Sequence, residues 1–338
     1  MMGRKLGKQT FAFDKPIYYI GAYSVVGDKE GEGPLGKGFD VIMPDCKWGE
    51  KSFEKAERKM FKTAMEGCVK IAGCNMSDVD MVIGGDLLNQ IISASFAVAD
   101  FEGSYVGVYG ACSTMAESLL VGGCMIDGGF AEKTVCVTSS HFCSAERQYR
   151  FPLEMGAQRT PTAQWTVTGA GGALLSSCGQ GPVLESGTFG TVIDMGVSDV
   201  NNMGAAMAPA ASSTICAHFE ATKTTPEDYD LILTGDLGML GKELATELIR
   251  RSGYEIAGKI EDCGCLIFDE SQDVHMGGSG CGCSASVLNS EIYKKLRDGT
   301  YKKILFVATG ALLSLTSSMQ GDSVPSIAHA VCIRGENA

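Results

Sequence analysis

Two segments of the chain repeat earlier segments in the same order. Residues 78–87 (DVDMVIGGDL) align with residues 228–237 (DYDLILTGDL) at an offset of 150, and five of the ten positions are identical. Residues 129–140 (GFAEKTVCVTSS) align with residues 299–310 (GTYKKILFVATG) at an offset of 170. Two matches in the same order predict a duplicated unit. We expect residues 1–178 and 179–338 to form two halves that pack as one pseudo-twofold unit.

The spacing of apolar residues predicts alternating strands and helices. Apolar residues recur every three to four positions after Ser52, which is typical of a helix face, and a second helix is expected from about Ser113. Strands are expected at residues 16–26, 80–83, 105–109, 134–138, 231–233 and 304–307, and a glycine-rich loop at 27–38. Strands that alternate with helices indicate a layered α/β fold.

Composition excludes several classes of protein. The chain has 338 residues, 45% of them hydrophobic and 20% charged, which excludes a disordered protein. Its net charge of −12 and the absence of basic runs longer than two residues argue against nucleic acid or anionic lipid as the main partner. The longest apolar stretch, residues 304–315, is too short to span a bilayer. The N-terminus lacks the apolar segment of a signal peptide, so the fourteen cysteines are expected to be reduced.

The duplication also predicts where a ligand would bind. Ligands of layered α/β folds gather beyond the carboxyl ends of the strands, and a pseudo-twofold axis brings matching loops of both halves together there. The loops concerned are 84–90, 110–114, 138–142, 234–238, 275–284 and 309–314.

Residues 109–120 (YGACSTMAESLL) carry the sharpest chemical motif, in which a strand turns through a small residue into Cys112 and a helix. A thiol at a helix N-terminus lies among unpaired N–H groups, which favour a thiolate and can hold an oxyanion. The alternative is a cysteine that only packs in the core.

Several ordered motifs make the chain similar to the thiolase superfamily, nearest in layout to ketoacyl-acyl-carrier-protein synthase III. They are GACST (110–114), TSSH (138–141), WTVTGAGGALLSS (165–177), GGSGCGCSASVL (277–288) and ATGALLSLTSSMQGDSVPSIAHAV (308–331). Within the superfamily, GKQT (7–10), AERQYRFP (145–152), AMAPAA (206–211) and YDLILTGDLG (229–238) resemble the stage V sporulation protein AD family of endospore-forming bacteria.

This resemblance implies a thiolase-like five-layered α-β-α-β-α fold. It also implies a sporulation protein that binds dipicolinic acid (pyridine-2,6-dicarboxylate), alone or as its calcium salt, and helps to move it into the developing spore. The implied protein is a homodimer that lies peripheral to the spore inner membrane through other stage V sporulation membrane proteins.

The chain departs from the enzymes of the superfamily at the residues that handle protons. Condensing enzymes pair the cysteine with a histidine and with a second histidine or asparagine. Cys112 matches the nucleophile, but Gly235 and Asp236 stand where the synthase pattern has its first histidine, and a carboxylate there would oppose a thiolate. His275 lies upstream of the second catalytic loop and could reach the site. We therefore expect a non-catalytic protein, with a cysteine-dependent acyltransferase and a structural subunit of a membrane transport complex as alternatives.

A buried dicarboxylate needs cations or hydrogen-bond donors. Bidentate arginine suits a planar carboxylate, and the N–H groups at Cys112 and Ser113 could hold one end of the ligand. The other candidates are Arg147, Arg150, Gln158, Arg159, His141, Asn89, Asp236 and His275. The alternatives are surface ion pairs for the arginines, a structural role for His141 and helix capping for Asp236.

Cys-Gly-Cys occurs at 263–265 and again at 281–283. Structural zinc sites commonly space their cysteines by two to four residues, so tight packing of small residues is the preferred interpretation. No metal or cofactor is expected.

Overall fold

The computed structural model describes residues 4–149 and 158–336. The first half contains β1 (Arg4–Lys5), β2 (Thr10–Val26), α1 (Asp28–Gly31), β3 (Val41–Ile42), α2 (Phe53–Ile71), β4 (Met81–Asp86), α3 (Ile92–Ala97), β5 (Ser104–Gly107), α4 (Thr114–Asp127), β6 (Lys133–Ser140), α5 (Phe142–Tyr149), β7 (Trp165–Thr166) and β8 (Gly169–Ser176). The second half contains β9 (Val183–Thr188), α6 (Met203–Thr222), β10 (Leu231–Thr234), α7 (Gly238–Arg251), β11 (Ile260–Asp262), α8 (Cys263–Ile267), β12 (Gly278–Ser279), α9 (Cys281–Val287), α10 (Tyr293–Arg297), β13 (Lys303–Ala311), α11 (Leu315–Met319) and β14 (Ser326–Arg334).

The strand order shows the duplication directly. Strands of the first half lie in the order β2-β8-β6-β4-β5, and those of the second half in the equivalent order β9-β14-β13-β10-β11. The two sets join where β2 pairs antiparallel with β9. The repeated segments become equivalent strands, β4 with β10 and β6 with β13. This confirms the predicted duplicated α/β fold, while the boundary at residue 178 stays a prediction.

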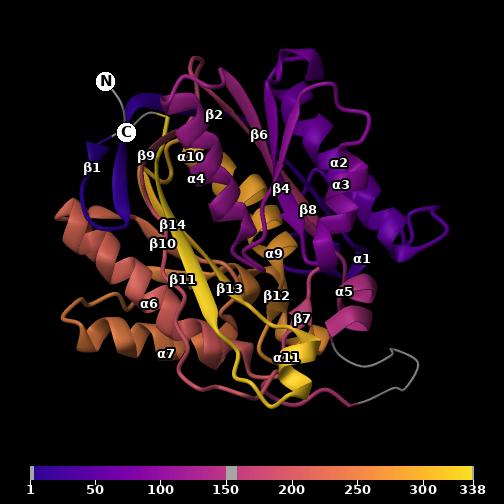
Figure 1. The fold of residues 1–338 in the computed structure, drawn as a ribbon, viewed down its shortest axis with the longest axis vertical. Helices are drawn as coiled ribbons and strands as arrows, with labels where there is room; N and C mark the ends of the chain where they lie inside the picture. Colours follow the sequence, from indigo (N-terminus) through magenta and orange to yellow (C-terminus); the bar gives the residue numbers. More distant parts are fainter. Residues whose placement is uncertain (1–3, 150–157, 337–338) are drawn as a thin grey trace.

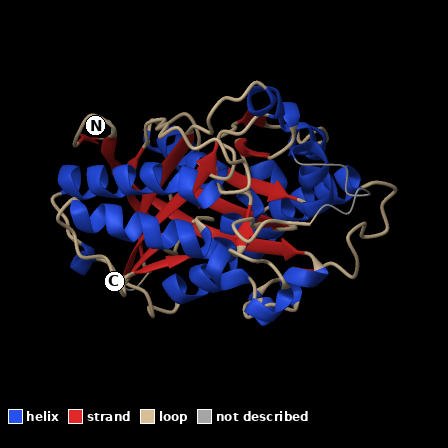
Figure 2. Ribbon diagram, turned by 90° about the horizontal axis from the view of Figure 1, so that it is seen from below, coloured by secondary structure: helices blue, strands red, loops and turns tan. Residues whose placement is uncertain are grey.

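Helices and strands form alternating layers (Figure 1). Helix α2 packs on β2, β6 and β8, and α6 packs on β13 and β14. Between the two groups of strands lie α4, which contacts strands of both halves, and α9. In Figure 2 the strands lie between helices on both sides. The arrangement is the expected five-layered thiolase-like fold.

The burial of the helices follows their sequences. Ser52 caps α2 by accepting a hydrogen bond from the backbone N–H of Lys55 at 3.3 Å, and one face of α2 is buried. Helix α9 is buried at every position and contains only small or apolar residues, as a helix between two sheets requires.

Two segments differ from the sequence-based expectation. The first strand begins at Thr10 instead of residue 16, because β2 pairs with β9 near its start and with β8 near its end. The expected loop at 27–38 contains the short helix α1, which Glu30 anchors by accepting a hydrogen bond from the backbone N–H of Thr168 at 2.9 Å. A buried glutamate inside a glycine-rich segment gives no periodic signal, so the pattern could not predict this turn.

Across residues 4–149 and 158–336, we find no helix with the length and apolar character that crossing a bilayer requires.

Candidate functional site

A cleft of about 460 Å³, measured out to its open mouth, lies between the two halves beside Cys112. Both halves contribute to its wall, and most of the lining is apolar or aromatic, as in small-molecule sites. The described residues that line it are Leu87, Tyr109, Ala111, Cys112, Ala145, Glu146, Tyr149, Thr166, Met203, Ser279, Ala311 and Leu313. Four of the six expected loops supply at least one of these residues.

The chain presents Cys112 through a strained turn. Ala111 has a φ of +51°, a left-handed conformation that costs free energy in residues other than glycine. Cys112 follows it, and α4 begins two residues later. The hydroxyl of Ser113 donates to the carbonyl of Gly110 at 2.7 Å, and the backbone N–H of Ser113 donates to the same oxygen at 3.0 Å. Ser113 therefore supports the turn with the groups that could otherwise meet a ligand.

Asp236 of the second half lies beside the Cys112 side chain and raises the pKa of its thiol. Its carboxyl is fully buried and accepts hydrogen bonds from the hydroxyl of Thr309 at 2.7 Å, the backbone N–H of Gly280 at 2.9 Å and the hydroxyl of Ser279 at 3.3 Å. Burial raises the pKa of Asp236 to about 6. The carboxyl is therefore a mixture of ionised and protonated forms in mildly acidic solution.

Burial is also the main reason why the pKa of Cys112 lies well above that of a free thiol, and the negative charge of Asp236 raises it further. Cys112 is only 6% exposed. At neutral pH the side chain is a thiol, in contrast to the thiolate that nucleophilic catalysis uses.

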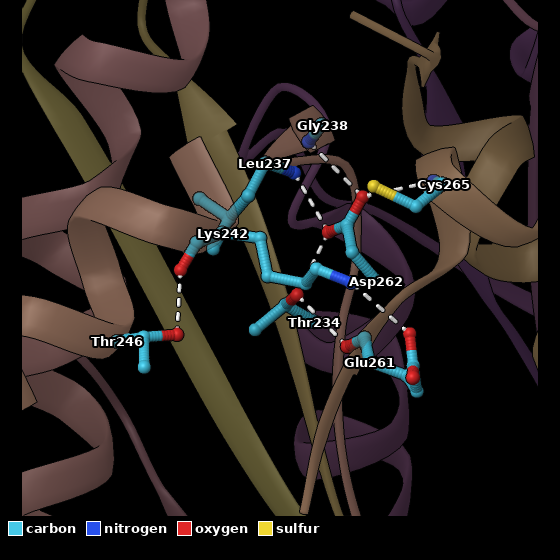
Figure 3. A network of polar contacts seen from close by, with 8 residues as sticks. All are labelled: Thr234, Leu237, Gly238, Lys242, Thr246, Glu261, Asp262 and Cys265. Atoms are coloured by element: carbon cyan, nitrogen blue, oxygen red, sulfur yellow. Dashed lines mark hydrogen bonds and ion pairs between the residues drawn. The ribbon is translucent and has the colours of Figure 1, made fainter. Parts of the chain in front are cut away.

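A second buried carboxyl fixes the loop that carries Asp236. Figure 3 shows Asp262 accepting hydrogen bonds from Thr234, Leu237, Gly238 and Cys265. The distances run from 2.7 Å for the Thr234 hydroxyl to 3.2 Å for the N–H of Cys265. Asp262 thereby holds both ends of the turn between β10 and α7. The sequence analysis missed it, although an aspartate before a helix is a recognisable N-cap signal.

All four histidines lie in the described part of the chain, and none of them lines the cleft. His141 is buried; its Nε2 contacts the carbonyl of Cys46 at 2.7 Å, and its Nδ1 accepts from the backbone N–H of Cys143 at 3.1 Å. Burial lowers the pKa of His141, so its ring is neutral at neutral pH. His275 contacts the carbonyl of Thr160 at 2.6 Å and pairs with Asp273 at 3.3 Å.

The remaining candidates lie away from the lining of the cleft. Arg147 forms an ion pair with Glu54, and Arg159 pairs with Asp273 at 3.2 Å. Gln158 is exposed. The N–H of Asn89 donates to Gln148 Oε1 at 3.0 Å at the rim of a neighbouring pocket. Arg150 lies outside the described residues.

Further polar groups line the cleft. The hydroxyls of Tyr109 and Tyr149 lie 2.8 Å apart, and that of Tyr149 also donates to the carbonyl of Leu87. The hydroxyl of Thr166 donates to Glu146 at 2.8 Å. Tyr109 is the first residue of the Cys112 motif at 109–120, so its position in the sequence could have indicated it. Thr166 and Glu146 come from segments whose folding onto the site no local pattern predicts.

Among residues 4–149 and 158–336, no three or more histidine, cysteine, aspartate or glutamate side chains are grouped as metal ligands would be. The Cys-Gly-Cys segments form the N-terminal turns of α8 and α9. Cys281 and Cys283 are fully buried in α9, where they pack between the halves.

Comparison with solved structures shows the fold. The 3-oxoacyl-[acyl-carrier-protein] synthase III of Aquifex aeolicus superposes with a TM-score of 0.57 and 13% identity over 94% of this chain and 99% of its own. Cerulenin-bound OleA of Xanthomonas campestris gives 0.59 with 11% identity over 95% and 97% of the two chains. Human mitochondrial 3-ketoacyl-CoA thiolase in complex with CoA gives 0.55 with 14% identity over 96% and 99%. At these identities the likeness establishes a thiolase-like fold and not an activity.

Comparison of sequences shows the family. A relative from Bacillus subtilis (strain 168), stage V sporulation protein AD, is 42% identical over 325 residues, which cover 96% of both proteins. The family profile for stage V sporulation protein AD (SpoVAD) matches residues 7–334, nearly the whole chain. The chain therefore belongs to the stage V sporulation protein AD family.

Proposed function

We propose that this sporulation protein binds dipicolinic acid in the Cys112 cleft without transforming it, and so aids its uptake into the developing spore. Membership of the family supports the sporulation role, and the ligand is the one that the sequence resemblance implies. The observation that carries the non-catalytic part is the buried Asp236 carboxyl, whose charge raises the pKa of the neighbouring Cys112 thiol.

Acyl transfer needs a nucleophilic thiolate and a group that returns protons to the substrate. Burial and Asp236 both favour the protonated thiol of Cys112. The described lining contains no imidazole. Such a cleft is suited to holding a ligand and poorly suited to forming a thioester.

The cleft offers donors and aromatic surfaces to a planar dicarboxylate. Hydroxyl groups of Ser279, Thr166, Tyr109 and Tyr149 line it. Each of them has a protein partner in the structure, so a hydroxyl that donates to a buried carboxylate of the ligand must exchange that partner for the ligand. The rings of the two tyrosines give a face on which a pyridine ring can stack. In this arrangement Arg147 and Arg159 act in surface ion pairs instead of at the ligand.

The protein reaches the spore inner membrane through other stage V membrane proteins, and dipicolinic acid enters the cleft alone or with calcium. The protein acts as a homodimer, as the sequence resemblance implies.

An acyltransferase remains the alternative that one specific observation favours. The strained Ala111 and the helix that follows Cys112 form the geometry that presents a nucleophile. Two measurements separate the functions: calorimetric titration with pyridine-2,6-dicarboxylate, and mass spectrometry of Cys112 after incubation with acetyl-CoA. Saturable binding without an adduct supports our proposal, and an acetyl adduct on Cys112 supports the enzyme. If neither binding nor an adduct is observed, the remaining alternative is a structural subunit of a membrane transport complex.

A further inference from the structure

Ser279 lines the Cys112 cleft and also hydrogen-bonds the fully buried carboxyl of Asp236. Its hydroxyl donates to Oδ2 of Asp236 at 3.3 Å. The other two bonds to this carboxyl are shorter, at 2.7 Å from the Thr309 hydroxyl and 2.9 Å from the N–H of Gly280. Hydrogen bonds weaken with distance, so the Ser279 hydrogen is the easiest of the three to release. Ser279 therefore connects a buried carboxyl to the cleft through a bond that can be exchanged.

The wall of the cleft offers an anion no positive side chain. Among the described lining residues, Glu146 supplies a carboxyl, and no lysine, arginine or histidine is present. Arg147, the next residue along α5, forms an ion pair with Glu54. A buried anion costs much free energy unless it meets a cation or hydrogen-bond donors, and a second negative charge close by adds repulsion. A dicarboxylate beside Asp236 therefore favours neutralisation of the Asp236 charge.

The titratable groups packed around Asp236 are cysteines and one further aspartate. Burial raises the pKa of the cysteines well above that of a free thiol, so they are neutral at neutral pH; they are Cys112 before α4, Cys263 in α8, and Cys281 and Cys283 in α9. Asp262 of β11 accepts from the N–H of Leu237, the residue after Asp236. Burial, and less strongly the charge of Asp262, raises the pKa of Asp236 to about 6. Asp236 is thus ionised at neutral pH but close to taking up a proton.

We propose that a carboxylate ligand enters the Cys112 cleft together with one proton from solvent, which Asp236 takes up, while Ser279 turns its hydroxyl from Asp236 to the ligand. This inference rests on the proposed binding of dipicolinic acid and adds a proton as a regulator of the same site. The proton adds to Oδ2 of Asp236, and the new O–H donates to Oγ of Ser279. The hydroxyl hydrogen of Ser279 then points to the ligand carboxylate. No bond between heavy atoms forms or breaks.

Binding that takes up a proton weakens as the pH rises. A carboxyl with a pKa of about 6 is about nine-tenths ionised at pH 7 and about half ionised at pH 6. Each bound ligand should therefore take up about 0.9 proton at pH 7 and about 0.5 proton at pH 6. By linkage, the dissociation constant should rise by up to about tenfold between pH 7 and pH 8.

The test is calorimetric titration of pyridine-2,6-dicarboxylate into the full-length protein at pH 7, in calcium-free phosphate and in calcium-free Tris. The two buffers differ in their heat of ionisation, so the difference between the observed heats gives the number of protons taken up per ligand. We expect about 0.9 proton per ligand. Saturable binding with equal heats in both buffers would overturn this inference and leave the proposed function standing. No saturable binding would overturn both.

Two variants locate the proton and the donor. Asp236→Asn should bind the ligand without proton uptake, because the amide is uncharged and can donate to Ser279 as the protonated carboxyl does. Its affinity should be the same at pH 6 and pH 8. Ser279→Ala should bind several-fold more weakly than wild type at pH 7, because the ligand loses a donor. Unchanged affinity of Ser279→Ala would overturn the role given to its hydroxyl.

Asp86→Asn is the matched control. Asp86 is the equivalent carboxyl of the first half, and burial raises its pKa to about 6 as well. Its oxygens accept from the backbone N–H groups of Leu88 at 2.8 Å and Ala94 at 2.7 Å, and it does not belong to the described lining of the cleft. This variant should therefore keep the proton uptake of wild type. Undiminished uptake in Asp236→Asn, or its loss in Asp86→Asn, would assign the proton to another group and overturn the proposal.

Discussion

Burial keeps the Cys112 thiol protonated, and the charge of Asp236 adds to this effect. Its carboxyl receives three hydrogen bonds from the loops around it, so it cannot turn away from the thiol without losing them. A protonated histidine at such a position would stabilise a thiolate by its positive charge, whereas a carboxylate destabilises the thiolate by its negative charge. One residue therefore moves the site from nucleophilic chemistry toward binding.

Replacing this carboxyl should make Cys112 more reactive. Asp236→Asn keeps the size of the side chain and removes its charge, so the pKa of Cys112 should fall. Each unit of that fall raises the thiolate fraction about tenfold at neutral pH. The measurement is the rate of iodoacetamide alkylation at the Cys112 peptide, followed by mass spectrometry. The matched control is Asp86→Asn in the equivalent position of the first half, and equal Cys112 rates in wild type and Asp236→Asn would contradict the account.

The sequence identified Cys112 and Asp236 because both lie in local motifs next to strands. It could not establish which basic residues face a ligand. Arg147 and Arg159 are charged residues on one segment, and the side on which they lie depends on how α5 and its neighbours pack. The sequence alone also could not predict that both ring nitrogens of His141 contact backbone groups.

At the scale of elements, the turn into α4 meets β13 across the interface between the halves. A Cβ added to Gly310 would lie far inside van der Waals contact with the carbonyl oxygen of Gly110. That carbonyl accepts both hydrogen bonds from Ser113. The close approach of β13 thus keeps the Cys112 turn in place, which explains a glycine inside a strand that is buried from Ile304 to Ala311.

Gly310→Ala should therefore destabilise the protein by about 1–3 kcal/mol, the usual cost of overpacking. The measurement is the free energy of unfolding in urea. Gly38→Ala is the control, because its nearest neighbour, an oxygen of Glu291, would lie 3.5 Å from the new Cβ. Equal stability of the two variants would show that the contact between Gly310 and the Cys112 turn leaves room for a side chain.

Elements were predictable where their pattern is local or repeated. The segments at 78–87 and 228–237 became β4 and β10, since buried strands with the same flanking turn have few alternatives. The helix α1 was not predictable, because it depends on the bond from the distant Thr168 to Glu30.

At the scale of the whole molecule, several buried carboxyls make stability depend on pH. Burial raises the pKa of Glu30 to about 7, and burial together with Asp86 raises the pKa of Glu57. Burial lowers the pKa of His218 and His329 to about 4. The histidine contributions rise with pH and level off above about 6.5, the pKa of an unfolded histidine.

Above pH 6.5, Glu30 and Glu57 determine whether stability rises or falls with pH. Unfolded glutamate is already ionised there, whereas the folded protein keeps protons on Glu30 and Glu57, so stability falls as the pH rises toward 8. Each such group contributes a slope of at most about 1.4 kcal/mol per pH unit, reached while the folded group is still fully protonated. Glu57→Gln should flatten the fall when urea midpoints are compared at pH 6.5 and 8. Glu66→Gln, on the exposed face of the same helix, is the control and should leave the fall in stability unchanged. A stability that rises between pH 6.5 and 8 would contradict the raised pKa values of Glu30 and Glu57.

The most direct test of the account is calorimetric titration of pyridine-2,6-dicarboxylate into wild type and Ala311→Trp, whose indole would fill the cleft beside Cys112. Circular dichroism of the variant first establishes that it is folded. We predict saturable binding of one ligand per chain to wild type and a loss of affinity of at least about tenfold, or 1.4 kcal/mol, in the folded variant. No binding to wild type, or equal affinity of the two proteins, would contradict a ligand site at this cleft.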